Sequence, residues 1–585
     1  MKDSYQIPQE IEQRINWLLI LIIISFLFLL INLWHLQIIR GGEFQERAVK
    51  NCIRSLVEEA PRGQIYDTHG DLLVNNRPNV IVSIIPAEVD NLEDLSIRLS
   101  KLINLSSEEI IKKVNKNFEN PYKAVKIFDD CPQHIIIEIE ENKDKLKGVI
   151  LEVYPRRNYI YQELAANCLG YVGEINKEEL ERSKNSSLQG GDIIGKAGLE
   201  KYYEEFLRGE KGGKEVEVDA LGREVATLLW KKPVPGNDLI LTIDKDLQRF
   251  GEKVLTGKNG SIILSNPQNG EILALINQPT FNPNQFANII SYEDWQRLST
   301  DPDYPLTNRA VQNTYQPGST FKIVTGLAAL EEGISNSTRK IYCSGKFTLK
   351  DQVFSCWKKE GHGSLSFVDA LAQSCNIYFY TLGMELGINR MEKYMQKLGL
   401  GEEISIDLPE VASGIRPSAQ WKQRELNEIW FPGDDINLSI GQGYLLVSPL
   451  QMHSIICAVA TEGLLYRLHL VKQIISAEGQ LVQNFSPELS RRIDISKQTF
   501  KLVKEGLRAT IVKGTGWRAN SNEISIAGKT GTAQNPHGEN HAWFVGFAPY
   551  EDPEICITVF LENGGEGGEA AAPIAREILE YYFRM

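Results

Sequence analysis

The longest hydrophobic run in the chain lies near its start and extends from Trp17 to Leu36. About 20 predominantly apolar residues are enough for a helix to cross the hydrocarbon core of a membrane. A cleaved signal peptide has a shorter apolar region and a small-residue cleavage site, and we find no such site before Arg40. We therefore expect residues 1–40 to form a cytoplasmic tail and an uncleaved, single-pass transmembrane anchor.

Beyond the anchor, alternating and helical hydrophobic patterns are mixed up to residue 236, which indicates an α+β region. Nothing in this region carries obvious catalytic chemistry, so we expect 41–236 to be a scaffold or partner-binding pedestal. The predicted elements are a β-hairpin over 60–74 with its turn at 67–70, strands over 80–85, 135–139, 149–153 and 215–218, helices within 92–118, and a short helix over 196–209.

A turn-rich break at 233–237 precedes a second region, 237–585, in which strands near both ends enclose a helical middle. This order is typical of an α/β sandwich, with one antiparallel sheet beside a helical cluster. The fold class of the whole chain is thus expected to be α+β. The predicted strands are 239–242, 261–264, 272–276, 525–527, 542–547 and 555–560, and the helices include 247–255, 321–330 and 573–583.

Composition and charge narrow the function. A chain of 585 residues with 42% hydrophobic and 24% charged residues has the composition of a folded protein. The net charge of −13 argues against general nucleic-acid binding. Basic residues both precede the apolar run and follow it more densely, and the positive-inside rule alone would place the large domain in the cytoplasm.

The first candidate catalytic motif is Ser319-Thr320-Phe321-Lys322, which follows a Pro-Gly turn and opens a helical pattern. A serine hydroxyl becomes a nucleophile when a base takes its proton, and an amine can be that base if burial or a nearby cation lowers its pKa. The spacing places Ser319 and Lys322 on one helix face. The motif alone is weak, because a serine at a helix start is usually only a cap.

Two further motifs follow in the chain: Ser374-Cys375-Asn376, and Lys529-Thr530-Gly531-Thr532 just after a short apolar strand. Taken alone, the second could be a plain turn at a strand edge. The ordered triple, however, is the set of penicillin-binding proteins and serine β-lactamases, and the chain resembles that family. The flanking segments 315–322, 441–444, 448–452 and 541–549 strengthen the resemblance.

The first half of the chain resembles the same family more narrowly. Segments 60–67 and 198–200 are similar to the pedestal of class B penicillin-binding proteins. Trp357-Lys358-Lys359 with Gly361-His362-Gly363 is similar to the elongation-type subgroup. The resemblance implies a serine-type D-Ala-D-Ala transpeptidase, of the carboxypeptidase class of hydrolases, that builds cell wall during elongation and maintains cell shape.

Carried over to this chain, the resemblance implies roles for individual residues. Ser319 would attack the carbonyl between the terminal D-alanines of a peptidoglycan stem peptide, and Lys322 would take its proton. Ser374 would relay the proton to the leaving amine, Asn376 would hold the substrate amide, and Lys529 would keep Lys322 neutral and attract the terminal carboxylate. The remaining substrate-binding residues are Thr530, Gly531 and Thr532, and backbone N–H groups of Ser319 and Thr532 would form the oxyanion hole.

The resemblance also implies partners and a location. Expected ligands are D-Ala-D-Ala stem peptides and β-lactam antibiotics, and the expected partners are a glycosyltransferase of the SEDS family and other elongation machinery. Because the substrate lies outside the cytoplasmic membrane, we expect the catalytic domain there as well, against the charge bias around the anchor.

A separate cluster of candidate ligands comprises Cys343, Cys356, His362 and Cys375. Three cysteines and one histidine form a tetrahedral zinc set, although these spacings are wider than in zinc fingers, and elongation-type relatives resemble this arrangement. Two alternatives stay open: a disulfide between Cys343 and Cys356, or ordinary packing without a metal. A zinc ion here would brace Ser374 and Asn376.

Two other functions compete with transpeptidation. A β-lactamase or carboxypeptidase would pass the acyl group to water, but 424–427 lacks the Arg-x-Glu-x-x-Leu-Asn spacing of the class A lactamases. A non-catalytic scaffold that binds penicillin and activates a glycan polymerase would suit the anchor and pedestal. The intact triple motif favours an enzyme over the scaffold.

Overall fold

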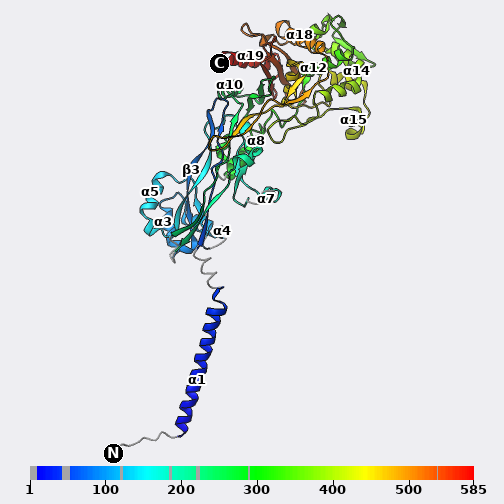
Figure 1. The fold of residues 1–585 in the computed structure, drawn as a ribbon. Coiled ribbons are helices and arrows are strands. Elements are labelled where there is room, and N and C mark those ends of the chain that lie inside the picture. The colour runs from blue at the N-terminus through cyan, green and yellow to red at the C-terminus, as the bar shows by residue number, and fades with distance from the viewer. Residues whose placement is uncertain are drawn as a thin grey trace, which may run out of the picture. The chain divides into compact units, whose positions relative to one another are not determined.

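The computed structural model describes residues 9–42, 53–116, 118, 121, 123–183, 188–218, 224–287, 290–536 and 538–585. They divide into two compact units, each assembled from separate stretches of the chain (Figure 1). The first unit contains Met1–Ala60, Pro78–Tyr154 and Glu210–Val234; the second contains Pro61–Arg77, Pro155–Gly209 and Pro235–Met585.

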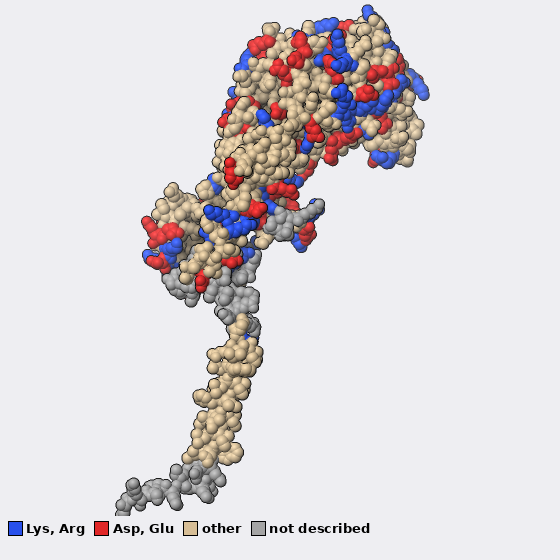
Figure 2. Space-filling view, in the orientation of Figure 1, with Lys and Arg blue, Asp and Glu red and all other residues tan. Residues whose placement is uncertain are grey.

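The first unit begins with the predicted apolar helix. Helix α1 (Gln9–Trp34) runs on into a π-helical turn, η1 (His35–Ile39). Arg14–Ile39 is the one stretch, among the described residues, that is helical, long and apolar enough to cross a membrane. Its large apolar side chains are exposed, and Figure 2 shows this helix almost entirely without charged residues. An exposed apolar helix of this length is suited to a membrane anchor.

Beyond this helix, the described residues of the first unit include a three-stranded sheet, part of a larger sheet and several helices. Strands β1 (Ile53–Glu58), β8 (Gly212–Val218) and β9 (Glu224–Lys231) form a three-stranded antiparallel sheet. The later residues of β3 (Leu72–Ile84) pair with β4 (Val125–Phe128). A core forms between these strands and helices α3 (Leu92–Ser100), α4 (Ser107–Lys116) and α5 (Gln133–Glu141).

The predicted strand over 135–139 is wrong, because these residues lie in α5. The run of isoleucines is rich in strand-forming residues, but Ile135 and Ile139 are four residues apart and both are buried, whereas Ile137 is half exposed. This burial follows helical periodicity rather than alternation. The strand predicted over 80–85 is not separate either; it is the second half of β3, which began at Leu72.

The second unit contains a sheet with the order β19–β18–β10–β2–β3. The predicted hairpin is confirmed, because β2 (Ile65–Tyr66) pairs antiparallel with the start of β3. Strand β2 also pairs in parallel with β10 (Asp238–Leu241), which follows the turn-rich break. The outer strands are β18 (Val471–Ile475) and β19 (Leu481–Asn484).

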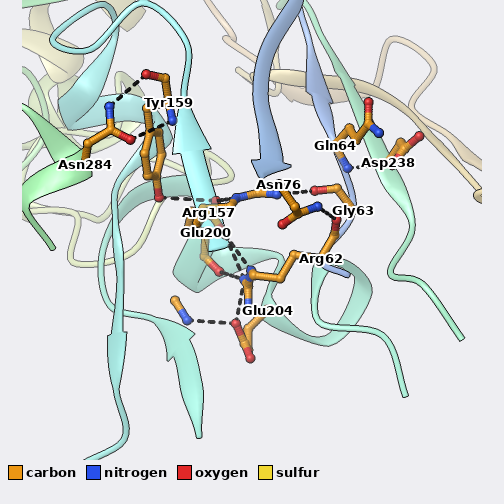
Figure 3. Close-up of polar contacts among 11 residues, drawn as sticks. Arg62, Gly63, Gln64, Asn76, Arg157, Tyr159, Glu200, Glu204, Asp238 and Asn284 are labelled. Carbon is orange, nitrogen blue, oxygen red and sulfur yellow. Dashed lines mark hydrogen bonds and ion pairs between the residues drawn. The ribbon is translucent and has the colours of Figure 1, made fainter. Parts of the chain in front are cut away.

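A buried ion-pair network fixes the segments around β2 (Figure 3). Glu200, in α8 (Gly198–Tyr202), accepts hydrogen bonds from Arg62 Nε at 3.1 Å and from Arg157 Nε at 2.6 Å. Arg62 also binds Glu204 at 2.8 Å, and Arg157 donates to the carbonyl of Gly63 at 2.6 Å. The network, which we call the Arg62–Glu200–Arg157 network, joins three stretches that are far apart in the sequence.

The larger part of the second unit is a three-layer sandwich. Its antiparallel sheet has the order β12–β11–β23–β22–β21. One face packs against helices α10 (Lys245–Leu255) and α19 (Ala571–Arg584), and the other packs against α12 (Lys322–Glu331), α17 (Pro449–Ala460) and α18 (Lys497–Lys513). The strands are β11 (Gly260–Ser265), β12 (Ile272–Gln278), β21 (Ala527–Ala533), β22 (His541–Ala548) and β23 (Ile555–Leu561). The α+β class and the predicted sandwich are confirmed.

Candidate active site

Two sequence-distant segments meet around the amine of Lys322, the first residue of α12. Lys322 Nζ donates to the Ser374 carbonyl at 2.9 Å and lies 3.2 Å from the Ser374 hydroxyl. It also lies 2.7 Å from Asn376 Oδ1. The side chain of Lys322 is fully buried. The structure therefore brings the Ser-x-x-Lys lysine into direct contact with both polar residues of the second motif.

Ser319 lies in a short 3-10 turn, η5 (Gly318–Phe321), directly before α12. This turn packs on strand β21: a Cβ atom added to Gly318 would lie 2.5 Å from the carbonyl oxygen of Thr532. Gly318 also has a φ of 53°, in the left-handed region, so glycine suits this position. The close contact places Gly318, which directly precedes Ser319, against the backbone of Thr532, the two segments from which the expected oxyanion hole would be built.

The second motif surrounds the start of helix α14 (Asn376–Lys397). Ser374 has a φ of 52°, an uncommon conformation for a residue other than glycine. Its N–H donates to Leu371, and the N–H of Cys375 donates to Ala370. This turn directs both the carbonyl and the hydroxyl of Ser374 towards Lys322.

The third motif lies inside a strand rather than after one. Strand β21 was expected to end at Ala527, but it extends from Ala527 to Ala533, and Lys529 pairs with Val545 of β22. Lys529 is fully buried, and its Nζ donates to the carbonyl of Thr530 at 3.0 Å. The predicted strand was too short because its second half is rich in glycine and threonine, which do not give the apolar pattern by which a strand is recognised in a sequence.

The expected carboxylate-binding residues follow on the same strand. Gly531 allows close packing, because an added Cβ would lie 2.8 Å from Thr320 Cγ2 and 3.0 Å from the Pro317 carbonyl. The hydroxyl of Thr532 accepts from the N–H of Gly567 at 3.3 Å. The hydroxyl of Thr530 lies 2.7 Å from that of Thr515.

Burial controls the charge state of both lysines. It lowers the pKa of Lys322 to about 8, while the charges of Cys375 and Cys356 act in the opposite direction. Burial also lowers the pKa of Lys529 far below its usual range, and the nearby charge of Lys322 lowers it further. A lysine with a pKa near 8 has a substantial neutral fraction at physiological pH and can accept a proton.

Several residues around the site were given no role in it from the sequence. The carbonyl of Gly441 accepts from the N–H of Gly318 at 3.0 Å and so supports the serine turn. Trp357 Nε1 donates to the carbonyls of Gln373 and Ser374. Thr515 lies outside all three motifs. Their contacts depend on tertiary structure. The Gly-Gln-Gly-Tyr segment and Trp357 had been singled out only because they resemble the penicillin-binding family.

The predicted cysteine and histidine ligands converge. The candidate ligand atoms of Cys343, Cys356, His362 and Cys375 all lie within 4.8 Å of one another. His362 Nδ1 is 3.5 Å from Cys343 Sγ and 3.6 Å from Cys356 Sγ, and all three cysteines are buried, free thiols. A hydrogen bond with Cys375 is the main reason that the pKa of Cys356 is lowered, which favours the thiolate that binds metal. The donor set and its compactness fit a tetrahedral zinc ion.

Comparison with known proteins identifies both halves of the chain. Residues 260–580 match the penicillin-binding protein transpeptidase domain, and residues 57–241 match the penicillin-binding protein dimerisation domain. The peptidoglycan D,D-transpeptidase MrdA of Acinetobacter baumannii is 34% identical, over 100% of this chain and 89% of that protein. MrdA of Escherichia coli K12 is 32% identical, over 94% of this chain and 91% of its own length.

Solved structures give the same result. A complex of penicillin-binding protein 2 with MreC from Helicobacter pylori contains a chain with a TM-score of 0.80 at 29% identity. The match covers 91% of this chain and 100% of that chain. A peptidoglycan synthase complex that coordinates polymerization and crosslinking contains a chain with a TM-score of 0.73 at 29% identity, with 98% of both chains covered.

Proposed function

Because the chain belongs to the penicillin-binding protein transpeptidases, we propose that it cross-links peptidoglycan stem peptides through an acyl-enzyme on Ser319. It is a peptidoglycan D,D-transpeptidase of the elongation type, similar to MrdA over almost its whole length. The single observation that carries the residue assignment is the contact of the buried Lys322 amine with Ser374 and Asn376, next to the serine turn.

The first half-reaction forms the acyl-enzyme. Ser319 Oγ attacks the carbonyl carbon of the bond between the two terminal D-alanines, and Lys322 Nζ accepts the hydroxyl proton. Backbone N–H groups of Ser319 and Thr532 stabilise the oxyanion. Ser374 relays a proton from Lys322 to the nitrogen of the departing D-alanine, so that the C–N bond breaks and a neutral amine leaves.

The second half-reaction forms the cross-link. The amine of a second stem peptide attacks the ester carbonyl, and its proton returns to Ser319 Oγ as the ester bond breaks. Burial and the charge of Lys322 lower the pKa of Lys529 in the free enzyme, and the anionic carboxylate of the donor peptide would favour its ammonium form. A charged Lys529 would then hold that carboxylate and help to keep Lys322 neutral. Thr530 and Thr532 donate hydrogen bonds to that carboxylate, and Gly531 allows the strand to pack against the serine turn.

The serine assignment has a direct test. Ser319→Ala should abolish covalent labelling by a fluorescent penicillin, because the attacking oxygen is removed. Ser299→Ala, which changes an exposed serine of helix α11 (Tyr292–Ser299), should label like the unchanged protein. Persistent labelling of a folded Ser319→Ala variant would refute the assignment, and mass spectrometry of the modified peptide would locate the true nucleophile.

We also propose a structural zinc ion held by Cys343, Cys356, His362 and Cys375. Zinc would hold the loop 356–362 next to the Ser374 turn, and acyl transfer itself needs no cofactor. Elemental analysis should find about one zinc per chain, and Cys343→Ser should lose it, whereas Cys131→Ser, which changes a buried cysteine elsewhere, should keep it. A metal-free, active preparation would defeat this proposal, and a Cys343–Cys356 disulfide in it would support the alternative.

The proposed location is the cytoplasmic membrane, with helix α1 as a single-pass anchor and the transpeptidase domain outside. The extracellular position of peptidoglycan supports this orientation against the charge bias. The proposed partners are a SEDS-family glycosyltransferase and other elongation proteins, which the MreC complex and the synthase complex of similar chains support. A reporter enzyme that is active only outside the cytoplasm, fused at the C-terminus, should be active; an inactive, stable fusion would reverse the orientation.

The sequence-based boundaries of the anchor (1–40), pedestal (41–236) and transpeptidase domain (237–585) stay predictions. A carboxypeptidase, a β-lactamase and a non-catalytic scaffold are not favoured, because the similarity to D,D-transpeptidases extends over the whole chain. Slow release of bound penicillin separates a transpeptidase from a lactamase.

A further inference from the structure

Thr515 lies in a short turn after helix α18, outside the three motifs, and this turn is held tightly next to the site. The N–H of Thr515 donates to the carbonyl of Ala372 at 3.1 Å. Gln373 Nε2 donates to the carbonyl of Lys513 at 2.9 Å. An added Cβ at Gly514 would lie 2.1 Å from the Ala372 carbonyl, so this turn closely contacts the segment that leads into Ser374.

The opposite side of the same turn contacts the segment that precedes α19. An added Cβ at Gly568 would lie 2.6 Å from the Thr515 carbonyl and 3.9 Å from Thr530 Cγ2. With its backbone held on both sides, Thr515 directs its hydroxyl to Thr530 Oγ1 at 2.7 Å. That distance is typical of a well-formed O–H···O hydrogen bond.

The direction of this hydrogen bond decides what Thr530 can do. Each threonine hydroxyl has one proton to donate and two lone pairs that accept. If Thr530 donates to Thr515, it has no proton left for a substrate anion. If Thr515 donates, the Thr530 proton is free, and a hydroxyl that accepts one hydrogen bond becomes a stronger donor of the next.

We propose that Thr515 is a positioning residue for carboxylate recognition: it donates its proton to Thr530 Oγ1, so that the Thr530 hydroxyl donates to the terminal carboxylate of the substrate. The inference rests on the proposed function, in which Thr530 binds that carboxylate. A bound substrate carboxylate favours the direction in which Thr515 donates to Thr530. Only then can the Thr530 hydroxyl donate its own proton to the carboxylate in a charge-assisted hydrogen bond.

The test compares two thioester substrates that share an acyl-D-alanyl group. One ends in thioglycolate, with a free carboxylate, and the other is its methyl ester, without the charge. Thr515→Val, which keeps the shape of the side chain but removes the hydroxyl, should lower kcat/KM about tenfold for the free acid and less than about twofold for the ester. Thr515→Ser should restore most of the loss, because it keeps the donor.

A double-mutant cycle makes the pairing explicit. In a Thr530→Val background, Thr515→Val should cause no further loss for the free acid, because it acts only through Thr530. Thr300→Val, at the end of helix α11, removes a threonine hydroxyl that donates only to the carbonyl of Gln296, so it serves as the control and should leave both substrates unaffected.

Three results would overturn the inference: no loss in Thr515→Val, equal losses for the acid and the ester, or losses that add to those of Thr530→Val. Mass spectrometry of the acyl adduct on the same samples keeps the two proposals distinct. An adduct on a residue other than Ser319 contradicts the proposed function, whereas an adduct on Ser319 with an unaffected Thr515→Val contradicts only the role of Thr515.

Discussion

At the scale of single residues, the charge of Lys322 is the central physical quantity. Its amine is fully buried and makes three contacts, with the Ser374 carbonyl, the Ser374 hydroxyl and Asn376 Oδ1. Polar contacts of this kind would suit an ammonium, but burial disfavours the charged form and dominates, so that the pKa falls to about 8. The Lys322 amine is therefore held by hydrogen bonds from the protein and can still act as a base.

The pH dependence of acylation should report this lysine. Below about pH 8 Lys322 is increasingly protonated and cannot take the serine proton, so the second-order rate of penicillin acylation should fall about tenfold per pH unit. Above the pKa the rate should level off. Stopped-flow acylation from pH 6 to about 9 checks this expectation, and a rate that is flat across the range would exclude Lys322 as the base.

At the scale of elements, strand β21 connects the fold to the chemistry. It carries Lys529, Thr530 and Thr532, it pairs with β22 along its length, and the serine turn packs directly on it. This arrangement requires glycine at position 531, because Thr320 Cγ2, the Pro317 carbonyl oxygen and Trp543 Cβ leave no room there for a side chain.

Gly531→Ala should therefore displace the serine turn from the strand. The added methyl group would lie 2.8 Å from Thr320 Cγ2 and 3.0 Å from both the Pro317 carbonyl and Trp543 Cβ. Overpacking of this kind costs about 1–3 kcal/mol, and we expect a lower thermal midpoint together with at least about tenfold slower penicillin labelling, since positioning errors near 1 Å have large effects on rate.

Gly190→Ala is the matched control, because an added Cβ there meets nothing within 4 Å. It should leave the thermal midpoint and the labelling rate unchanged. If Gly531→Ala behaved like Gly190→Ala, the close packing of the serine turn on β21 would be wrong.

At the scale of the whole molecule, an apolar anchor, a mixed α+β unit and a catalytic sandwich are built from one chain that crosses between its units several times. In the second unit, stretches as distant as 61–77 and 155–209 fold together with the catalytic region. The Arg62–Glu200–Arg157 network joins them, and Glu200 is fully buried between two arginines.

Glu200→Gln should destabilise the second unit strongly. Removing the charge of Glu200 takes away the carboxylate that Arg157 binds and leaves Arg62 with Glu204. Breaking a buried ion pair in this way costs about 3–5 kcal/mol. We expect a clearly lower thermal midpoint, measured by calorimetry, whereas Glu205→Gln, at an exposed position in the adjacent helix α9 (Glu204–Leu207), should change it little. Equal midpoints for the two variants would show that the network adds no stability.

The same carboxylate gives a pH prediction. Although burial raises its pKa, the charges and hydrogen bonds of Arg157 and Arg62 prevail, so the pKa of Glu200 is lowered in the folded protein. A lowered folded pKa means that the stabilisation is present above the ordinary value of 4.5 and is lost as the pH falls through the folded pKa. Glu200→Gln should reduce this acid-side loss of stability.

The sequence predicted those elements of the fold whose patterns depend only on residues close together in the chain. The anchor, the β2–β3 hairpin, the sandwich strands and helix α19 were found because their periodicity or turn residues act within a few positions. Residues 135–139 were misassigned because the isoleucines satisfy both strand propensity and a helical face, and only packing in the first unit decides between them.

By itself, the sequence determined the chemistry available: a candidate nucleophile with a nearby amine, two further polar motifs in order, a set of side chains that could hold a metal, and an apolar segment long enough to cross a membrane. Tertiary structure alone decided that Lys322 is buried against Ser374, that the third motif lies within a strand, and that Thr515 reaches Thr530. The physical reason is that burial and hydrogen-bond geometry arise between segments that are separate in the sequence, so no pattern within either segment predicts them.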